Sequence, residues 1–210
     1  MRSVSTESAP RGATDRLVWI DCEMTGLDPA VDALIEVAAL VTDVDLNVLG
    51  AGVNAVIQPE QEALDQMGDY VREMHVQSGL LDQLSEGMTM EEAQGLVVDY
   101  VRTWVPEPKK APLAGNTVST DRLFLARDMP VLEGHLHYRI VDVSSIKELA
   151  RRWYPRAYYN SPAKTGGHRA LGDIQDSIAE LHYYRQAVFR DPPGLDTGAL
   201  RALNNPPKTT

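Results

Sequence analysis

The chain has 210 residues, 43% of them hydrophobic, and a formal net charge of -10 at pH 7. This length suits one domain with a core of its own, and no apolar run approaches the roughly 18 residues of a membrane span, so we expect no contact with a membrane. The acidic charge argues against a protein that holds long nucleic acids, because such proteins neutralise many phosphates with Lys and Arg.

Three segments are expected along the chain. We interpret residues 1–15 as a flexible leader, residues 16–190 as the folded domain and residues 191–210 as a flexible tail. The leader has no apolar central region like that of a secretory signal, so cytoplasmic residence is the default expectation. The single cysteine, Cys22, cannot form an internal disulfide, which agrees with a reducing compartment.

Two acids follow the first expected strand, which is apolar and spans residues 17–20. Side chains alternate faces along a strand, so Asp21 and Glu23 point the same way while Cys22 points the other. The Cα atoms of the two acids should lie about 6.5 Å apart, close enough for both carboxylates to bind one metal ion. An acidic loop that binds no metal shows the same short pattern. Residues farther along the chain must therefore distinguish the two.

The remaining pattern predicts alternating strands and helices. Apolar and β-branched runs predict further strands over residues 34–41, 48–57, 112–115 and 138–143. Periodicity and end signals predict helices over residues 69–79, 89–105, 121–128, 144–153 and 169–189. This order predicts an α/β protein with a mixed five-stranded sheet, an antiparallel meander plus parallel strands, flanked by helices. In such sheets sites gather at the carboxyl ends of parallel strands, where Asp21 lies.

Helix ends carry their own signals. Thr89 and Glu92 are spaced for a capping box, and Ser144 or Ser145 is expected to cap the helix that follows. The last long helix is expected to bury an apolar stripe. Its members are Ile174, Ile178, Leu181 and Tyr184.

Two later segments supply candidates for the same site. Asp121 falls in the first turn of a helix that follows a strand, where an acid also stabilises the helix dipole without any other role. His168 lies five residues before Asp173, and on one helix their directions would differ by about 140°. We therefore expect His168 in the glycine loop ahead of the helix, free to reach a site that Asp173 enters. A surface or capping histidine is the alternative.

Together these segments resemble the DEDDh 3′-to-5′ exonucleases of the ribonuclease H-like fold, and within them the oligoribonuclease family. The resemblance runs over residues 17–189. The motifs that match are residues 19–29, Gly115-Asn116 with Asp121-Arg122, residues 137–139 with 142–144, residues 147–153, and His168 with Asp173. Long matches in this order are far more specific than any one of the acids.

The resemblance implies a two-metal site for phosphodiester hydrolysis. Asp21, Glu23, Asp121 and Asp173 would hold two Mg²⁺ or Mn²⁺ ions, which prefer oxygen ligands and can stabilise both the attacking and the leaving oxygen. His168 would take the proton from the attacking water. The implied substrate is short RNA, chiefly 5′-phosphorylated dinucleotides, cleaved to mononucleotides.

The resemblance also implies substrate contacts. Leu27 would wedge between bases, Tyr70 would stack on one, and Tyr138 would reach across a homodimer. The residues implied for phosphate and sugar contacts are His75, Thr117, Arg139 and Ser144. Three positions depart from the family pattern: Tyr70 stands where tryptophan is usual, Thr117 where serine is, and Gly172 where an acid often is. For Tyr70, Tyr138 and Arg139, packing or a surface ion pair is the alternative.

Two other functions stay open at this point. One is a broader DEDDh exonuclease that acts on longer single strands or proofreads DNA. The other is a catalytically silent scaffold of the same fold that binds nucleic acid or a protein partner. The four acids and the histidine argue against the silent scaffold.

Overall fold

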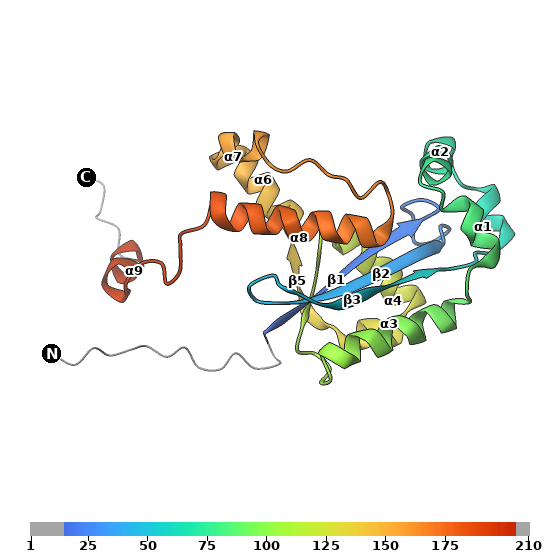
Figure 1. Cartoon of the computed structure of the whole chain (residues 1–210), viewed down its shortest axis with the longest axis horizontal. Coiled ribbons are helices and arrows are strands. Elements are labelled where there is room, and N and C mark those ends of the chain that lie inside the picture. The colour runs from blue at the N-terminus through green and yellow to red at the C-terminus, as the bar shows by residue number, and fades with distance from the viewer. Residues whose placement is uncertain (1–14, 205–210) are drawn as a thin grey trace.

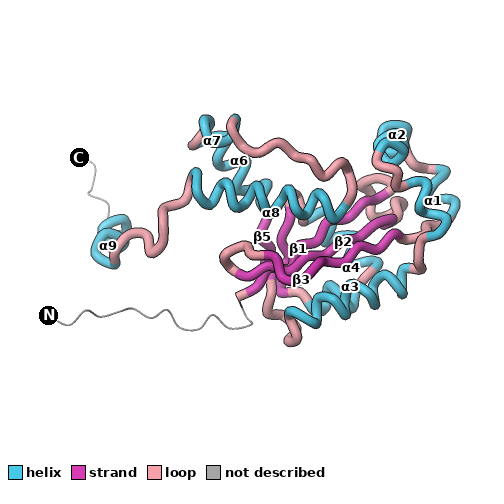
Figure 2. The backbone as a smooth tube through the Cα atoms, viewed as in Figure 1, coloured by secondary structure: helices cyan, strands magenta, loops and turns pink. Residues whose placement is uncertain are grey.

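The structure is a computed structural model that describes residues 15–204. The rest of the chain, which includes nearly all of the predicted leader and the end of the predicted tail, lies outside the described residues. One five-stranded sheet has the order β3-β2-β1-β4-β5, and this confirms the predicted sheet (Figure 2). The strands are β1 (Arg16–Met24), β2 (Leu34–Asp43), β3 (Val48–Val56), β4 (Pro112–Gly115) and β5 (His137–Asp142).

The pairing of the strands is mixed. β1 pairs antiparallel with β2, and β2 with β3, so the predicted meander is confirmed. β4 runs parallel to β1, and β5 parallel to β4. β1 continues to Met24 because its ladder with β2 extends through Asp21 and Glu23, the latter opposite Glu36. The predicted end at Ile20 was therefore too early, and the two acids lie within the strand.

Helices cover both faces of the sheet. Figure 1 shows α8 on one face and α3 and α4 on the other (Figure 1). The helices are α1 (Gln61–Asp65), α2 (Asp69–Gln77), the 3-10 helix η1 (Leu81–Glu86), α3 (Met90–Trp104), α4 (Ser119–Asp128), α5 (Pro130–His135), α6 (Val143–Trp153), α7 (Pro155–Tyr159), α8 (Ala170–Ala187) and α9 (Thr197–Asn204). The five predicted long helices are confirmed as α2, α3, α4, α6 and α8.

The short helices differ from the predictions. α5 and α7 each begin with a proline, in segments where we expected no helix. α9 falls within the predicted tail, and Figure 1 shows it apart from the sheet. Among the described residues, no helix has both the length and the apolar character that crossing a bilayer requires.

The residues of β1 divide between two cores. Ile20 and Cys22 pack in the core that includes residues of α3 and α4, so Cys22 points away from the acids as predicted. Trp19 packs in the core formed with α8. Because side chains alternate along a strand, Asp21 and Glu23 share the Trp19 face and point toward α8. The stripe predicted on α8 is buried as expected.

Two helix caps can be compared with the predictions. The capping box of α3 is confirmed, since the Glu92 N–H donates to Thr89 Oγ1 at 3.3 Å and the Thr89 N–H donates to the Glu92 carboxylate at 2.9 Å. The cap of α6 was predicted wrongly. Asp142, not Ser144 or Ser145, caps this helix, because its carboxylate accepts the Ser144 N–H at 2.9 Å.

Candidate active site

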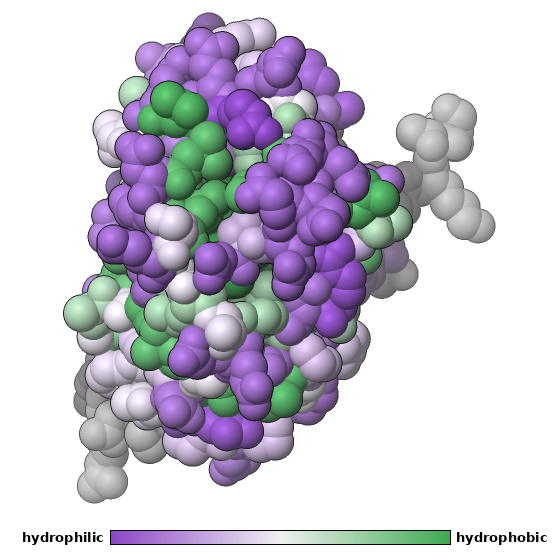
Figure 3. Space-filling model, turned by 90° about the vertical axis from the view of Figure 1, so that its right-hand side faces the viewer, coloured by the Kyte–Doolittle hydropathy of each residue, from purple (hydrophilic) through white to green (hydrophobic). Residues whose placement is uncertain are grey.

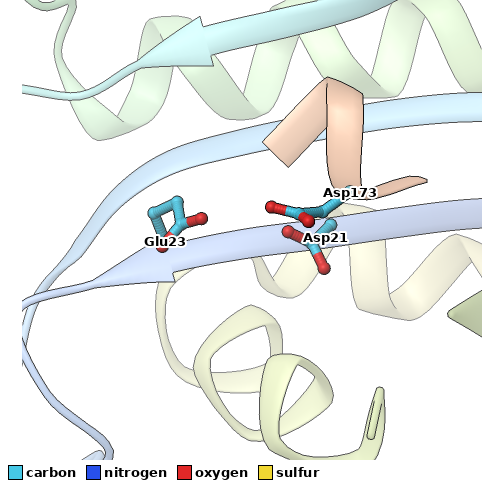
Figure 4. Close-up of side chains that lie close together, drawn as sticks. All are labelled: Asp21, Glu23 and Asp173. Carbon is cyan, nitrogen blue, oxygen red and sulfur yellow. The ribbon is translucent and has the colours of Figure 1, made fainter. Parts of the chain in front are cut away.

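Three acids from two elements converge over the sheet. Asp21 and Glu23 come from β1, and Asp173 comes from the first turn of α8. Each offers a carboxylate oxygen, and these oxygens all lie within 4.8 Å of one another. Figure 4 shows the Asp173 carboxylate facing Asp21 and Glu23 from the helix above the strand (Figure 4). The predicted direction of the two strand acids is therefore confirmed, and Asp173 joins them.

Asp121 lies next to this group but outside it. It stands in the first turn of α4, as predicted, and is buried. Its Oδ1 accepts the N–H of Cys22 at 2.9 Å, so its carboxylate contacts the backbone between the two strand acids. The structure thus brings three of the four predicted ligands within one ion's reach and holds the fourth against the same strand.

Burial and mutual repulsion raise the pKa values of these acids. Burial, followed by the charges of Asp121, Glu23 and Asp173, holds the pKa of Asp21 well above its usual range. Burial and then the charge of Asp173 raise the pKa of Glu23 to about 8. Burial raises the pKa of Asp121 to about 7, although backbone hydrogen bonds lower it. Ionising all of them without a counter-ion is unfavourable, which is the electrostatic condition expected of a cation site.

A cavity of about 440 Å³ opens over the three acids, and His168 lines it. As predicted, His168 lies in the loop ahead of α8 rather than on the helix. Its φ is 58°, in the left-handed region that residues other than glycine seldom adopt. Since Asp173 lines the same cavity, the loop and the first turn of α8 present an imidazole and a carboxylate to one space.

A pair of glycines lets this loop lie close to α8. A Cβ on Gly166 would stand 2.6 Å from the amide nitrogen of Asp173, and one on Gly172 would stand 2.8 Å from the Gly166 carbonyl oxygen. Side chains at these positions would push the loop away from the helix. Gly172 therefore lets the backbone of the loop and of the helix approach closely.

Glu36 on β2 holds the start of α8. Its side chain is fully buried, and its carboxylate accepts hydrogen bonds from the Arg169 guanidinium at 2.7 and 3.1 Å. It also accepts the Ala170 N–H at 3.1 Å and a side-chain N–H of Asn54 at 2.9 Å. Arg169 and Ala170 stand between His168 and Asp173, so this ion pair, whose carboxylate is buried, fixes the segment that carries both.

Removing the Glu36 carboxylate should destabilise the fold. We expect Glu36→Ala to lower the free energy of unfolding by about 3 kcal/mol, because it leaves the Arg169 guanidinium without its buried partner. Urea unfolding at pH 7 measures this. Glu148→Ala is the matched control, since it breaks a pair with Arg151 on the exposed face of α6 and should change little. A Glu36→Ala protein as stable as the control would contradict the assignment.

Three predicted substrate contacts are open to solvent. Leu27 after β1 is 74% exposed, Tyr70 on α2 is 80% exposed, and Tyr138 on β5 is 71% exposed. Figure 3 views the end of the molecule at which α1 and α2 lie, where apolar residues gather in a hollow between polar ones (Figure 3). Leu27, Tyr70 and Tyr138 are thus accessible to a ligand or a second copy, but the wedge, the stacking and the dimer contact remain predictions.

His75 on α2 occupies a different environment from the one predicted. Its side chain is fully buried, Nε2 lies 2.9 Å from the Met24 carbonyl oxygen, and Nδ1 lies 4.0 Å from a Glu23 oxygen. Burial lowers the pKa of His75, which favours the neutral ring. The structure places His75 behind Glu23, and its contact with a phosphate or sugar stays a prediction.

Thr117 and Ser144 meet at the start of α6, around Asp142. The Thr117 N–H donates to Asp142 Oδ1 at 3.0 Å, and the Ser144 hydroxyl donates to the same oxygen at 2.5 Å. Thr117 has a φ of 56°, in the left-handed region, and its N–H is bonded to Asp142. Arg139 lies along β5, where its Nε donates to the Tyr138 hydroxyl at 3.1 Å. Two of the predicted phosphate contacts are thus adjacent, and Arg139 is beside Tyr138.

Sequence reasoning gave no role to Glu36, Asp142 or Lys164. Glu36 is the one charged residue in the otherwise apolar run 34–41, and that isolation was an available signal. Asp142 stands two residues before Ser144, which suits a helix cap. Lys164 lies in a loop whose path no periodic pattern indicates.

The fold and this site are those of an exonuclease. The RNase T family model, described as an exonuclease, matches residues 18–181. Solved structures share the fold: exonuclease I from Methylocaldum szegediense has a TM-score of 0.59 at 20% identity, over 85% of this chain and 41% of that one. The zinc-bound E. coli exonuclease I complex with single-stranded DNA has a TM-score of 0.63 at 16% identity, over 83% and 41%. This chain spans only about 41% of those proteins.

Closer relatives match over nearly their whole length. The oligoribonuclease of Streptomyces griseus is 68% identical over 189 residues, which cover 90% of this chain and 94% of that protein. The oligoribonuclease of Mycobacterium leprae is 57% identical over 184 residues, covering 87% and 86%. The chain belongs to the oligoribonuclease family of hydrolytic exonucleases.

Proposed function

We propose that this chain hydrolyses short oligoribonucleotides from the 3′ end, chiefly 5′-phosphorylated dinucleotides, to mononucleotides, by a two-metal mechanism with His168 as general base. The observation that carries the proposal is the convergence of Asp21, Glu23 and Asp173 within 4.8 Å, in the cavity that His168 lines. Relatives that are named oligoribonucleases support the substrate class.

The donor set fits divalent cations. Carboxylate oxygens are the ligands that Mg²⁺ and Mn²⁺ prefer, and a bound cation would relieve the burial and mutual repulsion that raise the pKa values of Asp21 and Glu23. Asp21, Glu23, Asp121 and Asp173 are the residues that would hold the ions. When bound, two such ions stabilise the attacking and leaving oxygens of an in-line displacement at phosphorus.

The chain's own residues position the substrate and move one proton. The neutral imidazole of His168 accepts the proton of the attacking water, a general-base role that its place beside the acids supports. Leu27 and Tyr70 hold the bases, and stacking on an aromatic ring is worth about 1 to 3 kcal/mol per base without regard to sequence. Thr117, Ser144 and Arg139 contact the 5′-phosphate and the sugar.

The proposal includes a homodimer and cytoplasmic residence. β5 is at the edge of the sheet and carries the exposed Tyr138, and an unpaired edge strand with an exposed aromatic residue suits contact with a second copy. In the dimer, Tyr138 of one copy reaches the site of the other. The free thiol of Cys22 supports a reducing compartment.

A length series tests the proposed substrate. With Mn²⁺ present, we expect kcat/KM to be highest for the 5′-phosphorylated dinucleotide and to fall for tetramers and ten-mers, because an acidic protein with few phosphate contacts gains little from a longer strand. EDTA should abolish turnover. The dinucleotide without its 5′-phosphate is the control for the Thr117 and Ser144 contacts. Faster cleavage of the ten-mer would indicate a broader exonuclease, and binding without turnover a silent scaffold.

A further inference from the structure

One lysine lines the cavity over the acids. Of the residues that line it in the described part of the chain, Lys164 is the only Lys or Arg. It lies in the loop that leads from α7 to α8, which Figure 1 shows running alongside α8 to the helix start. Neither the acid cluster nor the general-base role of His168 explains its presence.

The backbone next to Lys164 is tied to α8. The N–H of Thr165 donates to Asp176 Oδ2 at 2.5 Å, the N–H of Gly166 donates to the same oxygen at 2.7 Å, and the Thr165 hydroxyl donates to Oδ1 at 3.1 Å. Asp176 is three residues after Asp173 on α8. The helix that carries Asp173 therefore also fixes the backbone that directly follows Lys164.

The ammonium of Lys164 is near the acids and is not paired with any of them. Its charge lowers the pKa of both Asp21 and Asp173, against the burial that raises them. Nevertheless, within residues 15–204 it forms no ion pair within 4.0 Å. Once divalent cations neutralise the carboxylates, the anion left for a lysine in this cavity is the phosphate of the substrate.

We propose that Lys164 is a further catalytic residue, whose ammonium donates a hydrogen bond to a non-bridging oxygen of the phosphodiester being cleaved. In this reaction the water oxygen bonds to phosphorus, His168 takes the water proton, and the bond from phosphorus to the 3′-oxygen breaks; that oxygen takes a proton from solvent water and leaves as the 3′-hydroxyl. Lys164 transfers no proton. It stabilises negative charge on the phosphoryl oxygens, the role of cations in phosphoryl transfer generally. The inference rests on the proposed function, because it needs a phosphodiester over the acids.

The test compares charge removal at two lysines. Lys164→Gln should lower kcat/KM by about 10²-fold, and Lys164→Arg, which keeps the charge, should retain more activity. Lys110→Gln is the matched control: Lys110 pairs with Glu107 ahead of β4, at the opposite end of the strand from the site, and should keep wild-type kinetics. A contact with the scissile phosphate predicts the same fold-loss for dinucleotides with and without a 5′-phosphate.

Two further measurements separate this role from a structural one. Mn²⁺ binding without RNA, followed by calorimetry, should be no weaker in Lys164→Gln than in the wild type, because the variant removes a cation from the neighbourhood of the ions. Binding of the dinucleotide with Ca²⁺ in place of Mn²⁺, which tests affinity apart from turnover, should weaken by about tenfold.

The inference is overturned by any of three results. These are a kcat/KM of Lys164→Gln within twofold of the wild type, a loss confined to the 5′-phosphorylated substrate, and a loss that accompanies weakened Mn²⁺ binding. If the wild type cleaves the ten-mer but not the dinucleotide, the proposed substrate length is wrong. The ratio of kcat/KM for Lys164→Gln to that of the wild type, measured on the ten-mer, then tests the role of Lys164.

Discussion

Asp21→Asn is expected to lower kcat for the 5′-phosphorylated dinucleotide by about 10³-fold or more. Asp21 offers one of the three carboxylate oxygens that lie within 4.8 Å of one another, and the amide is a neutral, poorer ligand for Mg²⁺ or Mn²⁺. Bound metal ions contribute several kcal/mol of transition-state stabilisation, and each ~1.36 kcal/mol is a factor of ten in rate. Steady-state kinetics at saturating Mn²⁺ measure the effect.

The same substitution should make the metal-free protein more stable. Asp21 is buried beside Glu23, Asp121 and Asp173, so removing its charge removes repulsion that the fold otherwise bears. In EDTA, urea unfolding should therefore need more denaturant for Asp21→Asn than for the wild type, whereas added Mn²⁺ should stabilise the wild type more.

Asp99→Asn is the control for both measurements, because it removes one charge from an exposed position on α3, across the sheet from the site. It should leave kcat and stability near their wild-type values. Activity of Asp21→Asn within tenfold of the wild type would contradict the assignment of Asp21 as a ligand. A loss of activity together with a loss of metal-free stability would point to misfolding instead.

His168→Ala is expected to lower kcat by about 10²- to 10⁴-fold, the contribution that a positioned general base usually makes. The side chain lines the cavity over the acids, so its loss leaves the attacking water without a proton acceptor. His182→Ala, which removes an exposed histidine farther along α8, is the control and should keep wild-type activity.

The dependence on pH identifies the role. A general base acts only in its unprotonated form, so a rate that depends on one rises with pH and then levels off. The wild type should show this rise, and His168→Ala should lack it. An unchanged pH profile in the variant, with only a small loss of rate, would exclude His168 as the base.

The fold was predictable to the extent that it depends on local patterns. The alternation of β1, the capping box at Thr89 and the apolar stripe of α8 each lie within a short window, and the structure confirms them. The end of β1 was not predictable in this way. Acids such as Glu23 are rare inside strands, and the ladder to Glu36 on β2 that keeps it in the strand is a long-range contact.

The candidate site was likewise predictable only where residue type and local spacing indicate it. Asp21, Glu23, Asp121, His168 and Asp173 were recognisable from residue type, spacing and resemblance, and the structure brings three of the acids and the histidine to one cavity. The contact between Glu36 and Arg169 spans 133 positions in the chain, so no local signal predicts it. The burial of His75 behind Glu23 likewise depends on how α2 packs against the end of β1.

A cavity with a single lysine has a consequence for where the enzyme acts. A ligand that makes few charge contacts releases few counter-ions when it binds, so its affinity changes little with ionic strength. The net charge of -10 meanwhile disfavours polymeric RNA and DNA. Under the proposed function, such polymers should therefore compete poorly with the short substrate for the site.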